Sequence, residues 1–281
     1  MTGHLRWAAG RSLPADNHVH SEWSYDTDDA ASMRRSCERA LELGVPAVSF
    51  TEHLDFTTWS LGDAATNLTS LRRGICDLDV DGYLECIEDC RRRFPGLKIL
   101  SGIEAGEPHL VGESLFGVVR RGAFDRVLGS LHALVLDDRL VPVEDTFSIL
   151  GEMTAIRSYF AELLNLIDGS DLFEVLAHVD YPRRWIVDWD EAAFEEEYRA
   201  VFSALATTDR VLEMNTYTPL ASARLIRWWR AEGGRTVSFG SDAHVPHLVG
   251  DKFDLAVAIV EDAGFTAAKS PEGFWTSGSP R

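Results

Sequence analysis

A group of metal-binding residue types opens the sequence, in the stretch from Asp16 to Asp26. His18 and His20 are separated by one residue, and a carboxylate, Asp26, follows soon after them. In an extended strand, alternate side chains point to the same face, so two imidazoles at this spacing can reach one metal ion. Two unrelated surface histidines would produce the same pattern, so the pair alone does not decide between these interpretations.

Further histidines and acids follow short apolar segments, each at the end of a predicted strand. They are His18 and His20 after the first strand, His53 after the second, Glu104 after the third, His132 after the fourth, His178 after the fifth, and Asp242 and His244 after the seventh. Scattered structural histidines would also fall on helices and at strand starts, so the shared position favours one common site. By contrast, His4, His109 and His247 do not align with strand ends, and we expect surface or supporting roles for them.

The elements that would position these residues alternate between apolar strands and amphipathic helices. After the opening strand, further strands are predicted at 45–50, 97–104, 126–131, 173–177, 210–215 and 235–240. Helices are predicted from Asp28 or Asp29, over 80–94, unbroken from about Thr146 to Ile167, from Asp190, and over about 220–232 and 251–263. A loop rich in Asp and Pro is expected after the strand at 126–131.

Strands that alternate with helices imply right-handed crossovers and a parallel sheet. No Gly-x-Gly-x-x-Gly segment follows the first strand and no Walker-type phosphate loop occurs, so a nucleotide-binding open sheet loses its main support. The sequence therefore predicts a closed α/β barrel of seven strands with its chemistry at their C-terminal ends. We expect one domain over 1–281, with a core of about 16–265 and short N- and C-terminal extensions.

The composition limits the possible partners and the compartment. Asp and Glu number 45 against 27 Lys and Arg, and a net charge of −18 argues against long nucleic acid or an anionic membrane as a partner. The four cysteines form no C-x-x-C pair, so we expect reduced thiols. The N-terminus has no apolar targeting segment and no stretch is apolar enough to span a membrane, so a cytoplasmic location is expected.

Six segments occur along the chain in a characteristic order: HVHSEWSYD, TEH, GIEAGE, GSLH, AHVD and GSDAH. In this order they resemble the successive metal motifs of the polymerase and histidinol phosphatase (PHP) superfamily, over about residues 16 to 250. The SYD ending of the first segment and the stretch AHVDYPRR are most similar to the stand-alone histidinol-phosphate phosphatases. The resemblance implies a distorted (β/α)7 barrel that holds two to three divalent ions.

The resemblance also implies which residues bind each ion. The first ion would be held by His18, His20, Glu104 and Asp242; the second by Glu104 as a bridge with His132 and His178; and the third by Asp26, His53 and His244. Many members of the superfamily have histidine in place of Asp26. This difference affects the expected affinity of the third site for its metal ion, not the position of the site. Mixed imidazole and carboxylate ligands suit Zn, Fe or Mn better than Mg or Ca.

These residues predict a metal-dependent phosphomonoester hydrolase, most similar to a histidinol-phosphate phosphatase of histidine biosynthesis. A metal-bridged hydroxide would attack phosphorus directly. Besides Glu104, two catalytic residues are predicted: Arg183, which matches the arginine after the fifth-strand motif and would clamp the phosphate, and Asp180, which would protonate the leaving group or orient an imidazole. Arg184 is a second candidate for the phosphate, and Glu52 is a further candidate to support a ligand.

Two other functions fit the same residues. One is a PHP-family phosphodiesterase or nucleotidase that acts on small nucleotides, which the negative charge of the chain permits. The other is a non-catalytic, metal-binding regulatory module, although such domains usually lose ligands. In each enzymatic case the expected partner is a small phosphorylated metabolite. The natural substrate and the oligomeric state stay open.

Overall fold

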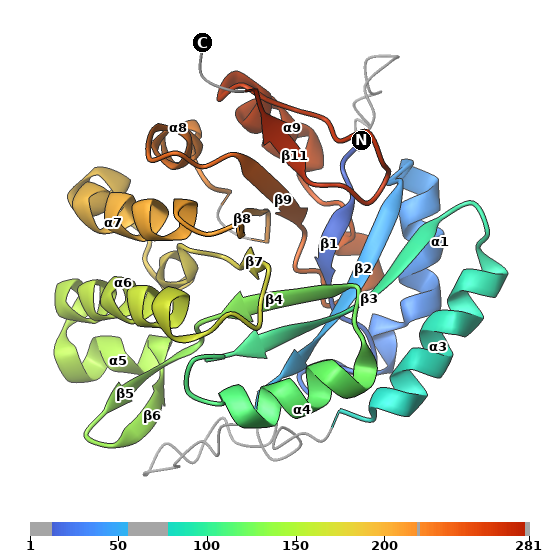
Figure 1. Ribbon diagram of the computed structural model, residues 1–281, viewed down its shortest axis with the longest axis horizontal. Helices are drawn as coiled ribbons and strands as arrows, with labels where there is room; N and C mark the ends of the chain where they lie inside the picture. The colour runs from blue at the N-terminus through green and yellow to red at the C-terminus, as the bar shows by residue number, and fades with distance from the viewer. Residues whose placement is uncertain (1–12, 56–77, 218–219, 279–281) are drawn as a thin grey trace.

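The computed structural model describes residues 13–55, 78–217 and 220–278, and shows a curled, mostly parallel sheet with helices on its outer side (Figure 1). The described residues form one nine-stranded sheet, in which neighbouring strands of the larger part run parallel. In sheet order, the parallel strands are β1 (Asp16–Val19), β2 (Ala47–Leu54), β3 (Lys98–Gly106), β4 (Arg126–Ser130), β7 (Val175–Leu176), β8 (Val211–Asn215) and β9 (Thr236–Gly240). The predicted α/β barrel architecture is confirmed, with seven parallel strands.

The sheet closes on itself only near the C-terminal ends of its strands. There, Val19 at the end of β1 and Ala243, which follows β9, form a parallel bridge, and His20 N donates to Ala243 O at 2.9 Å. Further from this end, β9 instead pairs antiparallel with β11 (Trp275–Ser277), which in turn pairs with β10 (Phe265–Thr266). These two strands were not predicted from the sequence. They make the barrel a distorted one, because β1 and β9 are neighbours over only part of their length.

Helices cover the outer side of the sheet (Figure 1). They are α1 (Met33–Leu43), α3 (Val80–Arg93), α4 (Gly112–Gly122), α5 (Val143–Leu150), α6 (Glu152–Gly169), α7 (Glu195–Ala206), α8 (Ala223–Ala231) and α9 (Phe253–Asp262). Short 3₁₀ turns are η1 (Asp29–Ala31), η3 (Tyr181–Trp185), η4 (Glu191–Phe194) and η5 (Pro246–Leu248). The helices predicted from Asp28 and Asp190 each begin with a 3₁₀ turn: Asp28 accepts from Ala30 N and caps η1, ahead of α1, and Asp190 accepts from Ala192 N and caps η4, ahead of α7.

Two sequence predictions need correction, and one helix was missed. The loop expected after β4 is a hairpin of β5 (Ala133–Leu136) and β6 (Arg139–Pro142), because Asp137 and Asp138 both adopt the positive φ that a two-residue hairpin turn requires. The helix expected from about Thr146 to Ile167 is broken at Gly151, whose φ of 76° is incompatible with a continuous helix. Helix α4 was not predicted, because only Leu115 and Gly122 are buried and its apolar stripe is correspondingly narrow.

One extended hydrophobic cluster fills the space between the sheet and its helices, and runs from Leu13 to Trp275. Its largest fully buried side chains include Trp229, Tyr83 and Tyr159. A single domain is compatible with this cluster and stays a prediction. Within the described part of the chain, no helix is both long and apolar enough to cross a membrane. Cys37, Cys86 and Cys90 are free thiols, whereas Cys76 lies outside the described residues.

Candidate metal centre

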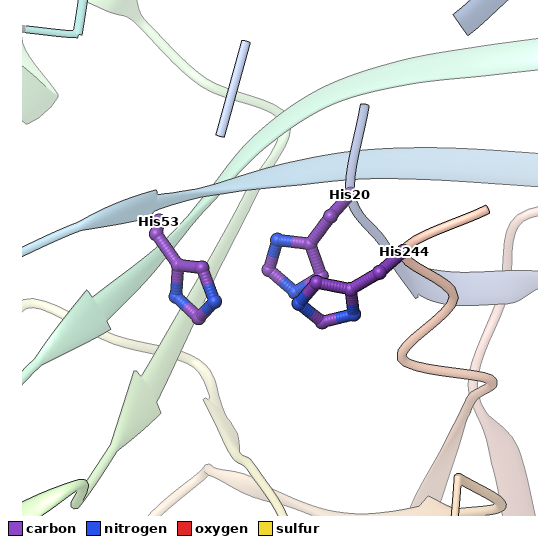
Figure 2. A group of neighbouring side chains, drawn as sticks. All are labelled: His20, His53 and His244. Carbon is purple, nitrogen blue, oxygen red and sulfur yellow. The ribbon is translucent and has the colours of Figure 1, made fainter. Parts of the chain in front are cut away.

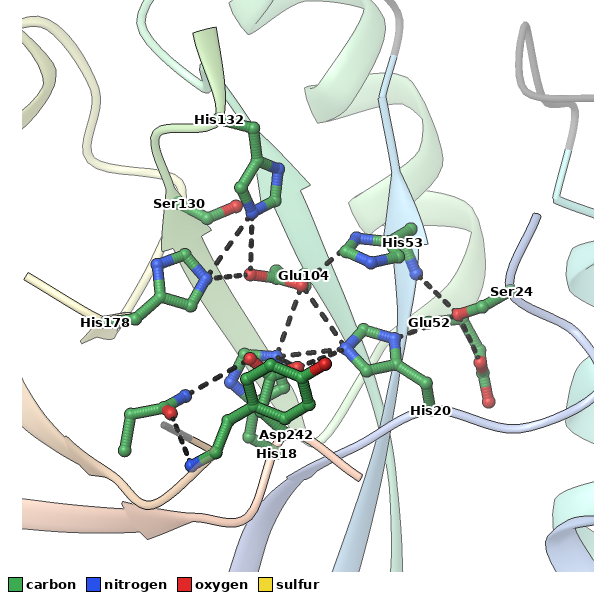
Figure 3. A network of polar contacts seen from close by, with 12 residues as sticks. His18, His20, Ser24, Glu52, His53, Glu104, Ser130, His132, His178 and Asp242 are labelled. Carbon is green, nitrogen blue, oxygen red and sulfur yellow. Dashed lines mark hydrogen bonds and ion pairs between the residues drawn. The ribbon is translucent and has the colours of Figure 1, made fainter. Parts of the chain in front are cut away.

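The carboxylate of Glu104 lies at the centre of the predicted metal-binding residues (Figure 3). Its oxygens are within 3.4 Å of ring nitrogens of five histidines: His18, His20, His53, His132 and His178. Asp242 Oδ1 lies 3.3 Å from His20 Nε2, and His244 Nε2 lies 2.9 Å from Asp26 Oδ2. The structure therefore brings all nine of these residues together at the C-terminal ends of the strands.

Two of the nine are positioned by the sheet itself. His53 and Glu104 are register partners on the parallel strands β2 and β3, so their side chains point to the same side of the sheet. As a result, His53 Nδ1 lies 3.1 Å from Glu104 Oε2. His53 Nε2 points the other way and lies 3.4 Å from Asp26 Oδ2. His53 thus faces Glu104 with one nitrogen and the proposed third site with the other.

Three imidazoles from separate parts of the chain lie close together (Figure 2). The ring of His20, just after β1, stacks against those of His53 and His244, with both ring centroids 4.2 Å away, and the latter two centroids are 5.8 Å apart. His244 Nδ1 donates to Asp242 O at 2.9 Å, so its Nε2 is the nitrogen that faces Asp26. These rings and Asp26 form the third predicted site, whose outer residues are partly exposed: the side chains of His244 and Asp26 are 27% and 29% exposed.

Two other predicted ligands lie beyond their strands on unusual backbone. His178 follows β7 with a φ of 21°, and Asp242 follows β9 with a φ of 53°. Non-glycine residues adopt positive φ only where surrounding contacts hold them, and such residues gather at functional sites. The Glu213 carboxylate holds His178 in this conformation, because the backbone N–H of His178 donates to Glu213 Oε2 at 2.7 Å. For Asp242, its N–H donates to His18 O at 2.7 Å.

Glu213 on β8 is the main supporting residue that the sequence analysis missed. Besides the N–H of His178, its carboxylate accepts from His18 Nδ1 at 2.7 Å, and it is 3% exposed. A Cβ at position 240 would lie 2.1 Å from Glu213 Oε1, so only glycine there allows this approach. One signal was present in the sequence: the sixth predicted strand was the one strand to which no ligand had been assigned, and Glu213 is its acidic residue.

A second set of hydrogen bonds fixes His20. Ser24 Oγ donates to Glu52 Oε2 at 2.7 Å and therefore accepts from His20 Nδ1 at 3.0 Å and from His53 N at 3.1 Å. Glu52 also accepts from Ser21 N and Ser21 Oγ, at 3.0 and 2.5 Å. Glu52 thus supports the imidazole of His20, as predicted for a ligand, through the hydroxyl of Ser24. Together these bonds place the proton of His20 on Nδ1 and leave Nε2 free to bind a metal.

The arrangement fits bound cations. His18 Nδ1 and His20 Nδ1 both have acceptors, so in the neutral rings the Nε2 atoms carry the lone pairs, and these two atoms face each other at 3.1 Å. Two lone pairs at this distance repel each other unless a proton or a metal cation lies near both. In addition, the buried Glu104 Oε2 has no hydrogen-bond partner among the described residues, although three imidazoles surround it. Imidazole and carboxylate donors of this kind suit a divalent transition metal.

The electrostatics of the centre lead to the same conclusion. Burial disfavours charged imidazoles, yet the carboxylates of Glu213, Glu104 and Asp242 raise the pKa of His18 well above its usual value. Burial also disfavours the charged form of His132, but Glu104 and Asp55 raise the pKa of this imidazole to about 10. The cluster therefore has an excess of negative charge, which protons offset when no other cation is bound. Divalent ions would neutralise it and leave the ring nitrogens as ligands.

The two arginines after His178 have different surroundings. Arg183 Nη1 contacts Asp180 Oδ2, Glu191 Oε1 and Leu220 O at 3.2 to 3.4 Å. Arg184 Nη2 instead pairs with Asp242, and its guanidinium lies over the rings of Tyr181 and Tyr217, 4.6 and 4.7 Å from their centroids.

The predicted catalytic residues Asp180 and Arg183 therefore contact each other, while Arg184 reaches the metal cluster. Consecutive residues in a 3₁₀ turn point in directions about 120° apart, which explains the difference. Of the remaining histidines, His109 pairs with Glu162 at 2.7 Å, His247 is exposed in η5, and His4 lies outside the described residues.

Comparison with known proteins identifies the family. A family model for the PHP domain matches residues 16–217, which is most of the chain. The chain belongs to the PHP domain family. This confirms the resemblance inferred from the six sequence segments, and the match includes seven of the nine proposed metal-binding residues, with Asp242 and His244 beyond its end.

Several PHP proteins resemble the chain over nearly its whole length. The probable histidinol-phosphatase of Clostridium acetobutylicum is 24% identical over 261 residues, covering 88% of this chain and 92% of the relative. The histidinol-phosphatase of Lactococcus lactis is 24% identical over 261 residues, with coverages of 89% and 91%.

Among solved structures, the Lactococcus lactis histidinol phosphate phosphatase complexed with zinc, L-histidinol and phosphate superposes with a TM-score of 0.79 at 22% identity, covering 94% of this chain and 99% of that one. A putative histidinol phosphatase from Listeria monocytogenes superposes with a TM-score of 0.70 at 17% identity, with coverages of 86% and 99%.

Proposed function

We propose that this PHP protein is a metal-dependent phosphomonoesterase that hydrolyses histidinol phosphate to L-histidinol and phosphate. The observation that carries the proposal is the buried cluster in which Glu104 contacts five imidazoles beside an arginine. The names of the relatives support the choice of substrate. The zinc and L-histidinol in the Lactococcus lactis structure support both a metal centre and this alcohol.

The nine residues would hold two to three divalent ions, of Zn, Fe or Mn. We assign His18, His20, Glu104 and Asp242 to the first ion, Glu104, His132 and His178 to the second, and Asp26, His53 and His244 to the third. When bound, these ions would supply activation of water and neutralise charge on the phosphoryl oxygens. The remaining chemistry, which is binding the phosphate and protonating the alcohol, falls to side chains around the cluster.

Arg184 is the stronger candidate for binding phosphate. Its Nη2 pairs with Asp242, and none of the described residues accepts a hydrogen bond from its Nε or Nη1. The planar guanidinium, which packs over two tyrosine rings, presents its remaining N–H groups in one plane, as bidentate phosphate binding requires. The prediction that Arg183 clamps the phosphate stays a prediction, since its Nη1 is shared among three acceptors.

Asp180 stays the proposed proton donor for the leaving alcohol. Burial raises the pKa of its carboxyl, while Arg183 acts in the opposite direction. A raised pKa keeps a carboxylic acid protonated closer to neutral pH, which suits a proton donor. In this assignment Arg183 positions Asp180.

The free thiols of Cys37, Cys86 and Cys90 support the proposed cytoplasmic location, where thiols remain reduced.

A substrate panel tests the proposal. Protein loaded with Zn or Mn should release phosphate from histidinol phosphate with a higher kcat/KM than from p-nitrophenyl phosphate, AMP or a cyclic dinucleotide. A preference for the nucleotides would instead support the phosphodiesterase or nucleotidase alternative. Protein that binds metal but hydrolyses none of the four compounds would support the regulatory module.

A pair of variants tests the phosphate contact. Arg184→Ala should lower kcat/KM for any monoester by about 30- to 1,000-fold, because a bidentate charge-assisted contact is lost. Bound metal, measured by elemental analysis, should change little. Arg183→Ala should cost less and should act mainly on kcat through Asp180. If Arg183→Ala has the larger effect on KM, then Arg183 is the phosphate residue and Arg184 only supports Asp242.

A further inference from the structure

An aromatic wall leads from the metal cluster to the surface. The ring of Tyr181 lies 5.0 Å from that of His132 and 4.8 Å from that of His178. Trp185 follows with its ring 4.9 Å from Tyr181, and Phe147 of α5 lies 6.4 Å beyond it. Trp185 is 41% exposed, so the wall reaches solvent. It lies where the alcohol part of a phosphoester would extend when its phosphate is at the metals.

Glu144 lies beside this wall, three residues before Phe147 on α5 and therefore on the same face of that helix. Val143 N donates to His132 O at 2.9 Å, so the first turn of α5 starts directly beside a proposed metal ligand, and Glu144 is the next residue. Glu144 is exposed, and partial desolvation by the surrounding protein raises the pKa of its carboxyl. His132 and Arg184 shift it in the opposite direction, which places the carboxylate within electrostatic reach of both.

Glu144 also differs from the other acids near this wall. Glu191 is engaged by Arg183 and by Ser222, and Asp180 is engaged by Arg183. In the described parts of the chain, no lysine, arginine or histidine lies at ion-pair distance from Glu144. An acid without a cationic partner beside exposed aromatic rings is the arrangement that binds an organic cation, through charge and through the ring faces.

We propose that Glu144, Tyr181 and Trp185 form an amine subsite, which binds the protonated amino group of a phosphorylated amino alcohol while its phosphate is held at the metal centre. This inference rests on the proposed function and specifies how the site selects its substrate. With metals bound, the inner end of the site would be positive, from the ions and Arg184, while Glu144 makes the other end negative. A substrate with phosphate at one end and ammonium at the other matches this polarity in only one orientation.

The kinetic test compares two esters that differ only in the amine. They are histidinol phosphate and 3-(imidazol-4-yl)propyl phosphate, which lacks the amino group. Glu144→Gln should lower kcat/KM for histidinol phosphate by about 10- to 100-fold, because the amide keeps an acceptor oxygen but loses the negative charge that faces the ammonium. It should change kcat/KM for the amine-free ester by less than about twofold. Asp145→Asn, the adjacent exposed acid on α5, is the matched control and should leave both values unchanged.

A binding measurement separates this inference from the proposed function. Calorimetry with the metal-loaded protein should show tighter binding of L-histidinol than of 3-(imidazol-4-yl)propan-1-ol, and Glu144→Gln should abolish the difference. Equal binding of the two alcohols by the parent, or equal losses on the two esters, would overturn the amine subsite. If the parent hydrolyses neither ester, the proposed function fails, and the binding comparison alone decides the subsite.

Discussion

The two halves of the metal centre are held by different kinds of structure. On one side, β2 and β3 pair through eight residues each, and His53 and Glu104 are part of this ladder. On the other side, β7 pairs with β4 and with β8 through only two residues each, and His178 after β7 and Asp242 after β9 lie beyond their strands at positive φ. The first half is positioned by backbone hydrogen bonds, whereas the second depends on side chains that hold the loops.

Glu213 takes the place of the missing ladder in the second half. It joins the N–H of His178 to the imidazole of His18, residues that are far apart in sequence. On the opposite side of the cluster, Glu107 makes a similar contact, because its Oε1 accepts from His132 N at 2.7 Å and from Ala133 N at 3.0 Å. Buried carboxylates can therefore fix metal ligands where strands are too short to do so.

The largest effect should come from losing the residue that the two halves share. Glu104→Gln should lower turnover by more than about 100-fold and should lower bound metal, because removing a ligand should exceed the 10- to 100-fold typical of its outer partners. Thermal unfolding in the absence of metal should change much less, since the ladder of β2 and β3 remains. An active variant with full metal content would show that Glu104 is not a metal ligand.

A chelator should likewise abolish activity of the parent, and added Mn or Zn should restore it.

Glu213→Gln tests the half that depends on side chains. The variant keeps the shape of the residue but removes its charge, so His18 and the loop of His178 lose their anionic acceptor. Metal affinity or activity should fall by about 10- to 100-fold. Competition with a chromophoric chelator measures the affinity. An unchanged affinity would mean that the backbone after β7 holds His178 without help.

Ser24→Ala tests the half that the ladder positions. His20 Nδ1 and His53 N lose an acceptor, but His53 stays in β2, so the effect should be smaller than that of Glu213→Gln. We expect a loss of at most about 10-fold in metal affinity. The same chelator competition gives the value. A loss larger than that of Glu213→Gln would contradict the comparison between the two halves.

Tyr83→Phe should have the smallest effect on the site and a clear effect on stability. The buried hydroxyl donates to Phe50 O at 2.7 Å and accepts from Gly102 N at 2.8 Å, so it bridges β2 and β3. Without it, the unfolding free energy in urea should fall by about 1–3 kcal/mol, the cost of unpaired buried groups. Metal affinity of the folded variant should stay unchanged. A coupled loss of metal would show that the ladder holds the ligands less rigidly than proposed.

The sequence by itself determined the fold class and the place of the centre. Apolar runs such as 97–104, separated by helix-period segments, require parallel strands, and parallel strands bring their C-terminal ends to one side of the molecule. Residues that follow those runs, such as His53 and Glu104, must then be neighbours. This inference needs only local periodicity and the handedness of the connections, and both can be read from the chain.

Only the tertiary structure decided which side chains support the centre. Arg183 and Arg184 are adjacent and chemically alike, and the 3₁₀ turn η3 directs one to Asp180 and the other to Asp242. Glu213 reaches His18 across the barrel because Gly240 leaves room for it. The first case depends on the direction of adjacent side chains in a turn, and the second joins residues that are far apart in sequence. Local sequence pattern contains neither kind of information, because both contacts form only when the sheet curls and brings its loops together.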